Sequence, residues 1–236
     1  MMTGTGVEDM GERLPSWLPK SPTGIEGFDQ ITDGGLPTGR PTLVCGPPGA
    51  GKSLFAVQFL VNGATLYAEP GVFLTFEEKR DDLVANVGSL GFDLDALERD
   101  GQLMLDALPL RPGAMATGEF NLEALKVRLA YAVDKISAKR VAIDSVEALF
   151  AAFAHPDLVR SELLSLFGWL KDQQLTTVIT GESGVGMLTR HGIEEYLSDC
   201  VVVLDHRVDH DVVTRRMRVL KYRGSSHGLN EYPFLV

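Results

Sequence analysis

The chain has 236 residues, 44% of them hydrophobic, and a formal net charge of −10 at pH 7. This length and apolar content are enough for one large α/β domain or two small ones. The acidic excess argues against a dedicated surface for nucleic acid or for anionic membranes. Residues 1–20 lack the apolar core of a secretory signal, and no apolar stretch approaches the length of a membrane span, so we expect a soluble cytoplasmic protein.

The two cysteines, Cys45 and Cys200, each lie inside a short apolar run. Such positions are typical of buried free thiols, and two isolated cysteines do not make a disulfide framework. We therefore expect free thiols in a reducing compartment.

Residues 1–20 are rich in Gly, Pro and charge, and predict a flexible N-terminal arm. Residues 21–39 are rich in turn-forming residues. They lead into a first core strand over residues 41–45. An apolar segment over residues 54–64 predicts the helix that follows.

Between this strand and helix, residues 46–53 read Gly-Pro-Pro-Gly-Ala-Gly-Lys-Ser and fit G-x-x-x-x-G-K-[ST], the phosphate-binding loop. The glycines permit the tight, partly positive-φ path by which backbone N–H groups converge on phosphate oxygens. Lys52 would bring a point charge to the β- and γ-phosphates, and the Ser53 hydroxyl would ligate Mg²⁺. The alternative is a Gly-rich turn without a ligand. The residues expected to contact the nucleotide here are Gly49, Ala50, Gly51, Lys52, Ser53 and Leu54.

The middle of the chain alternates strands with helices. Residues 72–76 predict a buried parallel strand that ends at Glu77-Glu78. Residues 81–90 predict a helix, and residues 102–106 predict another strand. The segment 109–118 contains two prolines and two glycines and predicts a loop.

Asn121 is the predicted N-cap of a long helix that reaches Ile136, because apolar residues recur there at helical spacing. Strands that are uniformly apolar and alternate with helices predict an α/β fold, in which a mainly parallel sheet has helices on both faces. The elements expected after this helix are a strand over 140–144, a helix over 156–173, a strand over 176–180, a mobile loop over 182–192, and strands over 200–204 and 215–222.

Three carboxylates follow the predicted strands at the edge where ligands bind in such sheets. Asp144 ends a strand and would hold Mg²⁺ through water, beside Ser53. Its alternative role is that of an ordinary strand-end Asp. Glu77 and Glu78 end the strand that we expect to neighbour the phosphate-loop strand. Because adjacent strand residues point to opposite sides, only one of the two would face the γ-phosphate and polarise a water for attack on it. The alternative is a solvated acidic turn.

Lys221-Tyr222-Arg223 closes a late strand, so that Lys221 and Arg223 share one face. A charged pair of this kind is usually just solvated. It would otherwise supply positive charge to a transition state in phosphoryl transfer.

Taken together, these residues resemble the KaiC-like branch of RecA-fold ATPases, over nearly the whole chain from Ser21 to Val236. The combination of motifs is specific, whereas the phosphate loop alone would not be. The matching segments are residues 24–29, Gly34-Gly35-Leu36-Pro37, the phosphate loop, residues 71–78, Ile143-Asp144-Ser145, residues 221–227 and Glu231-Tyr232-Pro233-Phe234.

The resemblance implies a RecA-like P-loop domain over residues 21–236 with a C-terminal β-hairpin, assembled into a hexameric ring with ATP or ADP and Mg²⁺ at each subunit interface. It implies that Glu77 is the water-activating base and that Glu78 lies near the metal with Ser53 and Asp144. Lys221 and Arg223 would reach the γ-phosphate on the adjacent subunit. The residues matching positions that touch the base or ribose are Ser89, Tyr222, Ser225 and His227.

Clock-type members of this family have two tandem domains, and the chain is similar to the N-terminal one, a slow ATPase. The C-terminal domain phosphorylates an adjacent Ser-Thr pair, which is matched here by Glu194-Glu195, so we expect no autokinase activity at that site. The second domain is absent, which suggests a single-domain relative or half of a longer chain. Clock-type rings also bind a small partner, KaiB, near a loop that matches residues 109–118, although this segment diverges in sequence.

Two other functions remain open. A DNA-dependent ATPase of the RecA/RadA type usually carries Asn-Gln after the strand over 176–180, where this chain has Gly181-Glu182 and a loop whose only Lys or Arg is Arg190. That difference and the acidic charge argue against nucleic acid as a partner. The other alternative is a signalling scaffold that ATP holds together, with incidental turnover.

Overall fold

The computed structural model describes residues 18–110, 121–153, 156–184, 189, 192, 197–209 and 212–234. Within these residues the main feature is an eight-stranded sheet in the order β10-β9-β8-β3-β7-β6-β4-β5. Neighbours from β5 to β8 pair in parallel, and β9 and β10 are added antiparallel. The expectation of a mainly parallel α/β sheet is confirmed. The strands are β3 (Pro41–Gly46), β4 (Gly71–Thr75), β5 (Leu103–Ala107), β6 (Arg140–Asp144), β7 (Thr176–Glu182), β8 (Cys200–Asp209), β9 (Val212–Tyr222) and β10 (Tyr232–Pro233).

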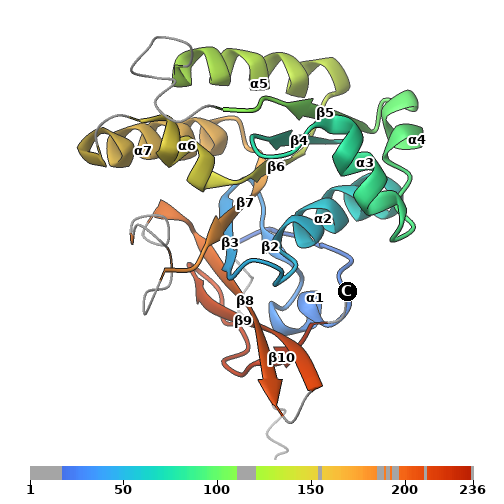
Figure 1. Cartoon of the computed structure of the whole chain (residues 1–236), viewed down its shortest axis with the longest axis vertical. Helices are drawn as coiled ribbons and strands as arrows, with labels where there is room; N and C mark the ends of the chain where they lie inside the picture. The colour runs from blue at the N-terminus through green and yellow to red at the C-terminus, as the bar shows by residue number, and fades with distance from the viewer. Residues whose placement is uncertain are drawn as a thin grey trace, which may run out of the picture.

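Helices cover both faces of the sheet, with α2, α3 and α4 on one side and α5, α6 and α7 on the other (Figure 1). Each face buries its own apolar cluster, one including Phe55, Phe59 and Phe73, the other including Leu125, Leu129 and Leu166. This is the layered arrangement that buries strands on both faces. The helices are α1 (Phe28–Ile31), α2 (Lys52–Tyr67), α3 (Arg80–Gly88), α4 (Leu94–Arg99), α5 (Leu122–Ile136), α6 (Val146–Ala152) and α7 (Pro156–Asp172).

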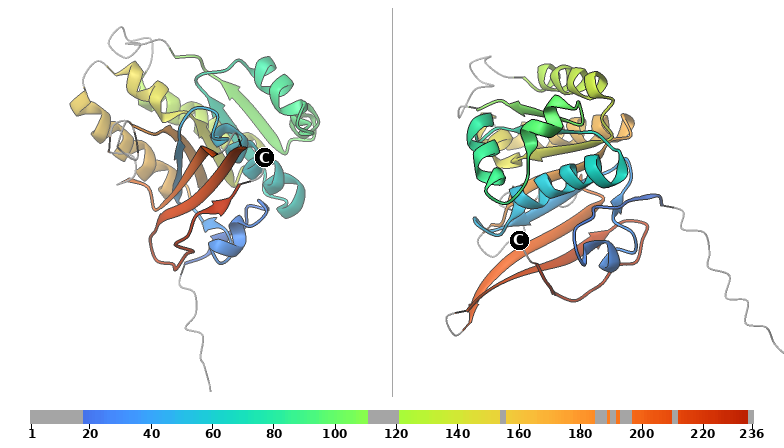
Figure 2. Two further views of the ribbon diagram at one scale, coloured as in Figure 1. Left: turned by 60° about the horizontal axis from the view of Figure 1, so that its bottom comes forward. Right: turned by 90° about the vertical axis from the view of Figure 1, so that its right-hand side faces the viewer.

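The long antiparallel hairpin of β8 and β9 extends beyond the helical layers (Figure 2). At its base, Cys200 pairs with Tyr222, and β8 pairs with β3 of the phosphate loop. The hairpin therefore starts beside the beginning of β3 and runs past the end of that strand, on one side of the parallel sheet. The predicted strands over 200–204 and 215–222 are confirmed, but both are longer than expected because each forms a ladder with the other beyond the apolar core.

Several other boundaries differ from the sequence predictions for tertiary reasons. The helix expected over 54–64 begins at Lys52 and continues to Tyr67. The helix continues through Gly63, and this glycine makes room for Arg140, since a Cβ at position 63 would lie 2.5 Å from Cδ of that arginine. Asn121 caps α5 as predicted, since its Oδ1 accepts a hydrogen bond from Ala124 N at 2.6 Å.

The short helices α4 and α6 were not predicted. The structure of the turn-rich segment 21–39 was not predicted either: there β1 (Lys20–Ser21) pairs with β2 (Leu36–Pro37), and α1 lies between them. The last three residues of the expected flexible arm, 18–20, belong to the fold, and Leu18 is buried. Residues 1–17 lie outside the described part of the chain.

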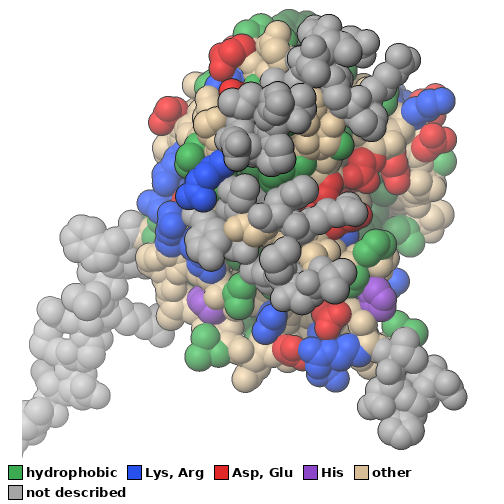
Figure 3. All heavy atoms as spheres, turned by 60° about the vertical axis from the view of Figure 1, so that its left-hand side comes forward, with side chains coloured by type: hydrophobic (Ala, Val, Ile, Leu, Met, Phe, Trp, Pro, Cys, Tyr) green, Lys and Arg blue, Asp and Glu red, His purple; other side chains and the backbone are tan. Residues whose placement is uncertain are grey.

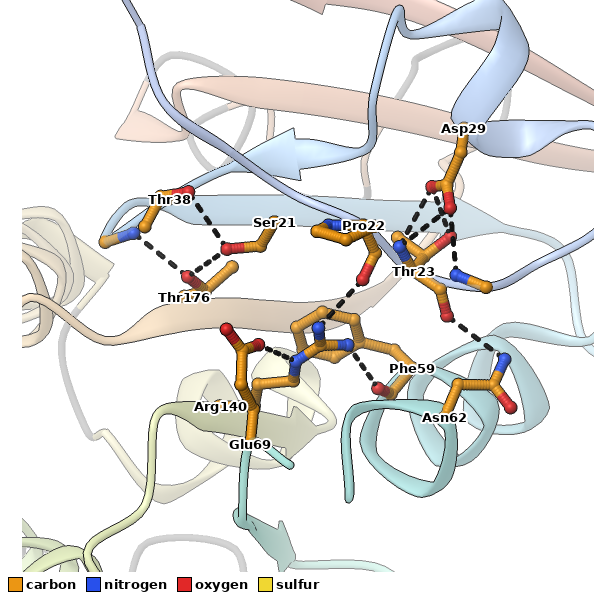
Figure 4. A network of polar contacts seen from close by, with 12 residues as sticks. Ser21, Pro22, Thr23, Asp29, Thr38, Phe59, Asn62, Glu69, Arg140 and Thr176 are labelled. Atoms are coloured by element: carbon orange, nitrogen blue, oxygen red, sulfur yellow. Dashed lines mark hydrogen bonds and ion pairs between the residues drawn. The ribbon is translucent and has the colours of Figure 1, made fainter. Parts of the chain in front are cut away.

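Arg140, the first residue of β6, ties this N-terminal segment to the domain (Figure 4). Its side chain is completely buried and lies over the ring of Phe59. The guanidinium donates to Glu69 Oε2 at 2.6 Å, to Phe59 O at 2.9 Å and to Pro22 O at 2.8 Å. These contacts join β6, α2 and the segment after β1 around one charge.

Candidate functional site

The phosphate loop leaves β3 at Gly46, where the sheet itself demands a glycine. A Cβ on Gly46 would lie 2.2 Å from the carbonyl oxygen of Leu204 on β8, which is far inside van der Waals contact. Positive φ angles occur further along the loop, at Gly49 (77°) and Gly51 (98°). The first glycine of the motif is thus required by close backbone approach, and the other two by chain direction.

The helix α2 begins directly after Gly51, which is its N-cap and supplies no side-chain cap. The first N–H groups of a helix have no acceptor within the helix, and its dipole places partial positive charge there. Ser53 is exposed in this first turn, and Ala50 is buried beneath the loop. The loop and helix therefore present backbone donors to an anion.

The ammonium of Lys52 lies over its own loop. Lys52 Nζ donates to Gly46 O at 3.0 Å and to Pro47 O at 3.1 Å. The charge is thus held at the mouth of the loop, beside the uncapped end of α2.

Asp144 lies at the end of β6, and β7 alone separates β6 from β3. Its side chain is buried, and the Thr180 hydroxyl of β7 donates to its Oδ1. A buried carboxylate fixed by one hydrogen bond keeps further lone pairs for another partner. Sequence reasoning missed Thr180, because a Thr inside an apolar strand has no pattern that distinguishes it.

Glu77 follows β4, but the predicted neighbour of this strand was wrong. The strand pairs with β5 and β6, so that β6 and β7 lie between it and the phosphate-loop strand β3. The error arises because parallel strands joined by crossover helices need not be adjacent in the order of the sequence. The residue therefore lies beside the end of β6, where the Ser145 hydroxyl donates to Glu77 Oε1.

Glu78 and Ser89 lie on the α3 side of this edge. The side-chain amide of Asn86 in α3 donates to Glu78 Oε2 at 3.5 Å, whereas Glu77 is bonded by Ser145. The two adjacent carboxylates thus have different partners. Ser89 is at the C-cap of α3, and its Oγ donates to Asn86 O at 2.7 Å.

Lys221, Tyr222 and Arg223 lie near the amino ends of the parallel strands, whereas the phosphate loop lies at their carboxyl ends. Tyr222 pairs with Cys200, which pairs with Thr42 at the start of β3, whereas the loop follows the last residue of that strand. The length of β3 separates the two groups by about 13 Å along the strand, and β8 lies between β3 and β9. Within one chain the structure does not bring Arg223 to Lys52.

Tyr222 is part of the core. Its side chain is buried, its hydroxyl donates to Gly35 O at 2.9 Å, and burial raises its pKa well above the ordinary range of a tyrosine. A nucleotide contact at this position would therefore use its backbone. Beyond it, Ser225 Oγ donates to Ser226 O at 2.9 Å, and His227 Nδ1 lies 3.0 Å from Gly228 O.

Asp199 is a charged residue near the start of β8 that no sequence pattern singled out. It is 3% exposed and is surrounded by Arg40, Lys171 and Arg223. The next residue, Cys200, is a buried free thiol, as is Cys45, which confirms that expectation. Burial raises the pKa of the Cys200 thiol to about 12.

Among the described residues, no three His, Cys, Asp or Glu side chains lie close enough together to form a metal site by themselves. No helix in the described part of the chain is both long enough and apolar enough to cross a membrane. The Glu194-Glu195 pair, Arg190 and residues 111–118 of the predicted 109–118 loop lie outside the described residues.

A strand that feeds a G-x-x-x-x-G-K-[ST] loop and an uncapped helix, within a RecA-like parallel sheet, defines a P-loop NTPase. Comparison with known families narrows this class. The family model described as "ATPase: KaiC" matches residues 21–236. The chain belongs to the KaiC ATPase family.

Curated relatives agree with that assignment. The chain is 52% identical over 220 residues to "Circadian clock protein KaiC2" of Synechocystis sp., covering 93% of this chain and 39% of the relative. It is 48% identical over 222 residues to "Circadian clock oscillator protein KaiC" of Parathermosynechococcus lividus, with 93% and 41% covered, and 46% identical over 222 residues to the protein of the same name from Synechococcus elongatus, with 93% and 43% covered. The chain thus spans about two fifths of the length of these relatives.

Proposed function

We propose that this chain is a Mg²⁺-dependent ATPase that slowly hydrolyses ATP bound between the subunits of a hexameric ring. The observation that carries the proposal is the separation of two cationic groups on one sheet. Lys52 lies at the end of β3 that carries the phosphate loop, and Arg223 lies near the start of β3, beyond Tyr222. In a head-to-tail ring the side of one subunit that carries Arg223 meets the phosphate-loop side of the next subunit.

The phosphate loop fits a nucleotide on the evidence of its own geometry. The uncapped N–H groups of α2 are donors without a partner inside the helix, and Gly49 and Gly51 give the loop the curvature that converges further donors. Lys52 would exchange the carbonyls of Gly46 and Pro47 for phosphate oxygens. The N–H groups of the Lys52 ammonium would remain hydrogen-bonded after the exchange, and its positive charge would lie beside the β- and γ-phosphates.

Glu77 is our choice for the base that orients and deprotonates the attacking water. Its carboxylate is exposed and is held from one side by the Ser145 hydroxyl, directly after Asp144. A carboxylate that is held but still open to water suits this task. Glu78 faces Asn86 instead, so it would act on the water less directly.

Mg²⁺ would be held by the Ser53 hydroxyl, with Asp144 and Glu78 contributing through water, and it would neutralise charge that develops on the phosphates. Asp144 suits this role because it is buried and anchored by Thr180, yet has lone pairs to spare. The phosphate oxygens would complete the coordination.

From the adjacent subunit, Lys221 and Arg223 would reach the γ-phosphate. Ser225, His227 and the backbone of Tyr222 would lie close to the base or ribose, with Ser89 supplied by the α3 side. The turn that contains Arg223 and Ser225 directly follows β9, so these residues move as one unit with the strand.

The role we propose is circadian or related signalling, in the cytoplasm, with a small KaiB-like protein as partner. It is supported by the names of the relatives, which describe circadian clock proteins. We propose no autokinase activity at Glu194-Glu195, since a carboxylate forms only a labile acyl phosphate and not the stable phosphate ester that a Ser or Thr hydroxyl forms. A DNA-dependent ATPase is the second candidate, and an ATP-held scaffold with incidental turnover is the third.

The test measures particle size by light scattering, with and without Mg-ATP, while released phosphate is followed. We expect a ring that forms with nucleotide and slow phosphate release. The variant Lys52→Ala should lose both, because the loop loses its phosphate charge. Glu77→Gln should form the ring but release no phosphate, and Glu78→Gln is its matched neighbour, with a smaller loss.

A monomer that hydrolyses ATP at the same rate as the assembled protein would overturn the proposal. Retention of single-stranded DNA that falls with salt would favour the recombinase-type alternative. Assembly with no measurable turnover in the unaltered chain would favour the scaffold.

A further inference from the structure

The cluster around Asp199 places a buried carboxylate beneath three basic side chains. Asp199 Oδ2 lies 3.1 Å from Lys171 Nζ, and Oδ1 lies 3.7 Å from Arg40 Nη1 and 3.6 Å from Arg223 Nη1. The carboxylate side chain is 5% exposed, whereas the cations are 33% to 55% exposed. One negative charge in contact with three positive charges leaves the group cationic toward the solvent.

Asp199 also fixes the backbone on which Arg223 is carried. Arg223 N donates to Asp199 O at 2.9 Å, and Asp199 N donates to Pro41 O at 3.0 Å, at the start of β3. The turn after β9 is thus tied to the same strand that ends in the phosphate loop. Gly224, with a φ of 81°, turns the chain immediately after the arginine.

This arrangement suits an arginine that must be aimed outward. A guanidinium has five N–H donors, and Asp199 approaches Nη1 from the protein side. Arg223 is the most exposed of the three cations, with 55% of its side chain accessible to solvent. An arginine whose orientation is biased by an ion pair from beneath loses less conformational entropy when it binds an anion than one that is free to rotate.

The three basic residues come from separate parts of the fold: the start of β3, the end of α7 and the turn after β9. Figure 3, which brings the side of α6 and α7 forward, shows a group of Lys and Arg side chains on one side of this face, apart from most of its Asp and Glu side chains. A face of positive charge on an acidic protein would meet a negatively charged neighbour favourably.

We propose that Asp199 is the positioning residue for Arg223, holding its guanidinium ready for the γ-phosphate bound by the adjacent subunit. The inference rests on the proposed function, because it concerns the step in which Arg223 acts across the interface. Asp199 touches no nucleotide itself. It sets the direction of the arginine, and Lys171 and Arg40 share its charge without taking part in the reaction.

The first experiment compares Asp199→Asn with Asp106→Asn in Mg-ATP hydrolysis. Asp106 is a matched control because it is a nearly buried carboxylate, bound by Arg128 at 2.6 Å, on β5 at the far edge of the sheet. Asp199→Asn should lower kcat by roughly 10- to 100-fold with little change in KM, since misplacing a catalytic group by about 1 Å costs this much and the phosphate loop is untouched. Asp106→Asn should leave kcat within about twofold.

Lys171→Met tests whether the cluster acts only as a structural hub. Lys171 is half exposed, so the variant should fold, and Asp199 keeps its contact with Arg223. We expect an unchanged kcat. A loss of kcat equal to that of Asp199→Asn would overturn the positioning role, as would a wild-type kcat in a folded Asp199→Asn.

The second experiment mixes subunits. A ring of Asp199→Asn and Glu77→Gln subunits contains interfaces in which an intact phosphate-loop side meets an intact Arg223 side. Random mixing makes about one quarter of the interfaces intact, so the mixture should be more active than either variant alone. Mixing remains informative if Asp199→Asn is less stable, because restored activity requires folded subunits.

Arg223→Ala mixed with Glu77→Gln separates this inference from the proposed function. If that mixture regains activity but Asp199→Asn alone is fully active, only the role of Asp199 is wrong. If Arg223→Ala is itself as active as the unaltered chain, the action of Arg223 across the interface is wrong, and the inference falls with it.

Discussion

Two buried charges, Arg140 and Asp199, lie at the amino ends of parallel strands, and their charges are balanced by different kinds of partner. Arg140 begins β6 and is completely enclosed by one carboxylate, two carbonyl oxygens and two aromatic rings. Asp199 precedes β8 and is covered by long, partly exposed cations. All of the contacts of the Arg140 charge lie inside the molecule, whereas the partners of Asp199 are partly exposed to solvent.

The difference indicates what each charge is for. The partners of Arg140 include backbone oxygens of α2 and of the segment after β1, so its replacement leaves buried acceptors unpaired. The partners of Asp199 can return to water if the carboxylate is neutralised. We therefore expect Arg140 to matter for stability and Asp199 to matter for the orientation of Arg223.

The largest effect is expected for Arg140→Met. The variant keeps the apolar stem but leaves Phe59 O and Pro22 O without their donor, and we expect a loss of about 3 kcal/mol in the free energy of unfolding. Urea unfolding measures it. Glu69→Gln is the matched control, since Glu69 is 32% exposed and the amide oxygen still accepts, and it should cost less than half as much. Equal losses would contradict this view of the Arg140 site.

The next effect is expected for Gly63→Ala. Its new Cβ would lie 2.5 Å from Cδ of Arg140, which is fixed by its three partners, so we expect a loss of about 1–3 kcal/mol by overpacking. Gly168→Ala in α7 is the control: nothing lies within 4 Å of its Cβ, and the helix should gain stability by up to about 1 kcal/mol. The cost of Gly63→Ala should shrink in the Arg140→Met background, and strict additivity in urea unfolding would argue against the contact.

A smaller effect on stability is expected for Asp199→Asn. Because its three cations can be solvated, we expect a loss of about 1 kcal/mol or less at low salt, and a smaller loss at high salt, where exposed pairs are screened. Unfolding measured at two ionic strengths tests this. The loss in Arg140→Met should be nearly independent of salt. A large, salt-independent loss in Asp199→Asn would remove the contrast between the two sites.

The smallest effect is a pH dependence beside Asp199. Burial favours the neutral thiol of Cys200 and raises its pKa to about 12. The folded-state pKa thus exceeds the unfolded one, so the associated stability is complete below about pH 8.5 and is lost as the pH rises, by a little under 1 kcal/mol at about pH 9. Urea unfolding of the unaltered chain should show this loss between neutral pH and pH 9. Cys200→Ala should show a smaller loss, and an equal pH dependence in both would mean that the Cys200 thiol is not its source.

The candidate site was only partly predictable. The phosphate loop was found because a short segment carries all of its own chemistry. The placement of Glu77 relative to β3 was not, since local sequence gives the strand but not its neighbours. Ser145 was noted only as part of a matching segment, and its bond to Glu77 was not predicted. Thr180 and Asp199 were not selected, because a polar residue inside or just before an apolar strand has no local pattern that marks a function.

By itself, the sequence determined the local features of this protein: the phosphate loop, the cap at Asn121, the buried free thiols and the alternation of strands and helices. These depend on residues that are close together in the chain, or on burial that composition reveals. Only the tertiary structure decided the order of the strands, the need for glycine at positions 46 and 63, and the distance between Arg223 and its own phosphate loop. Those properties depend on contacts between residues far apart in the chain, which no local pattern encodes.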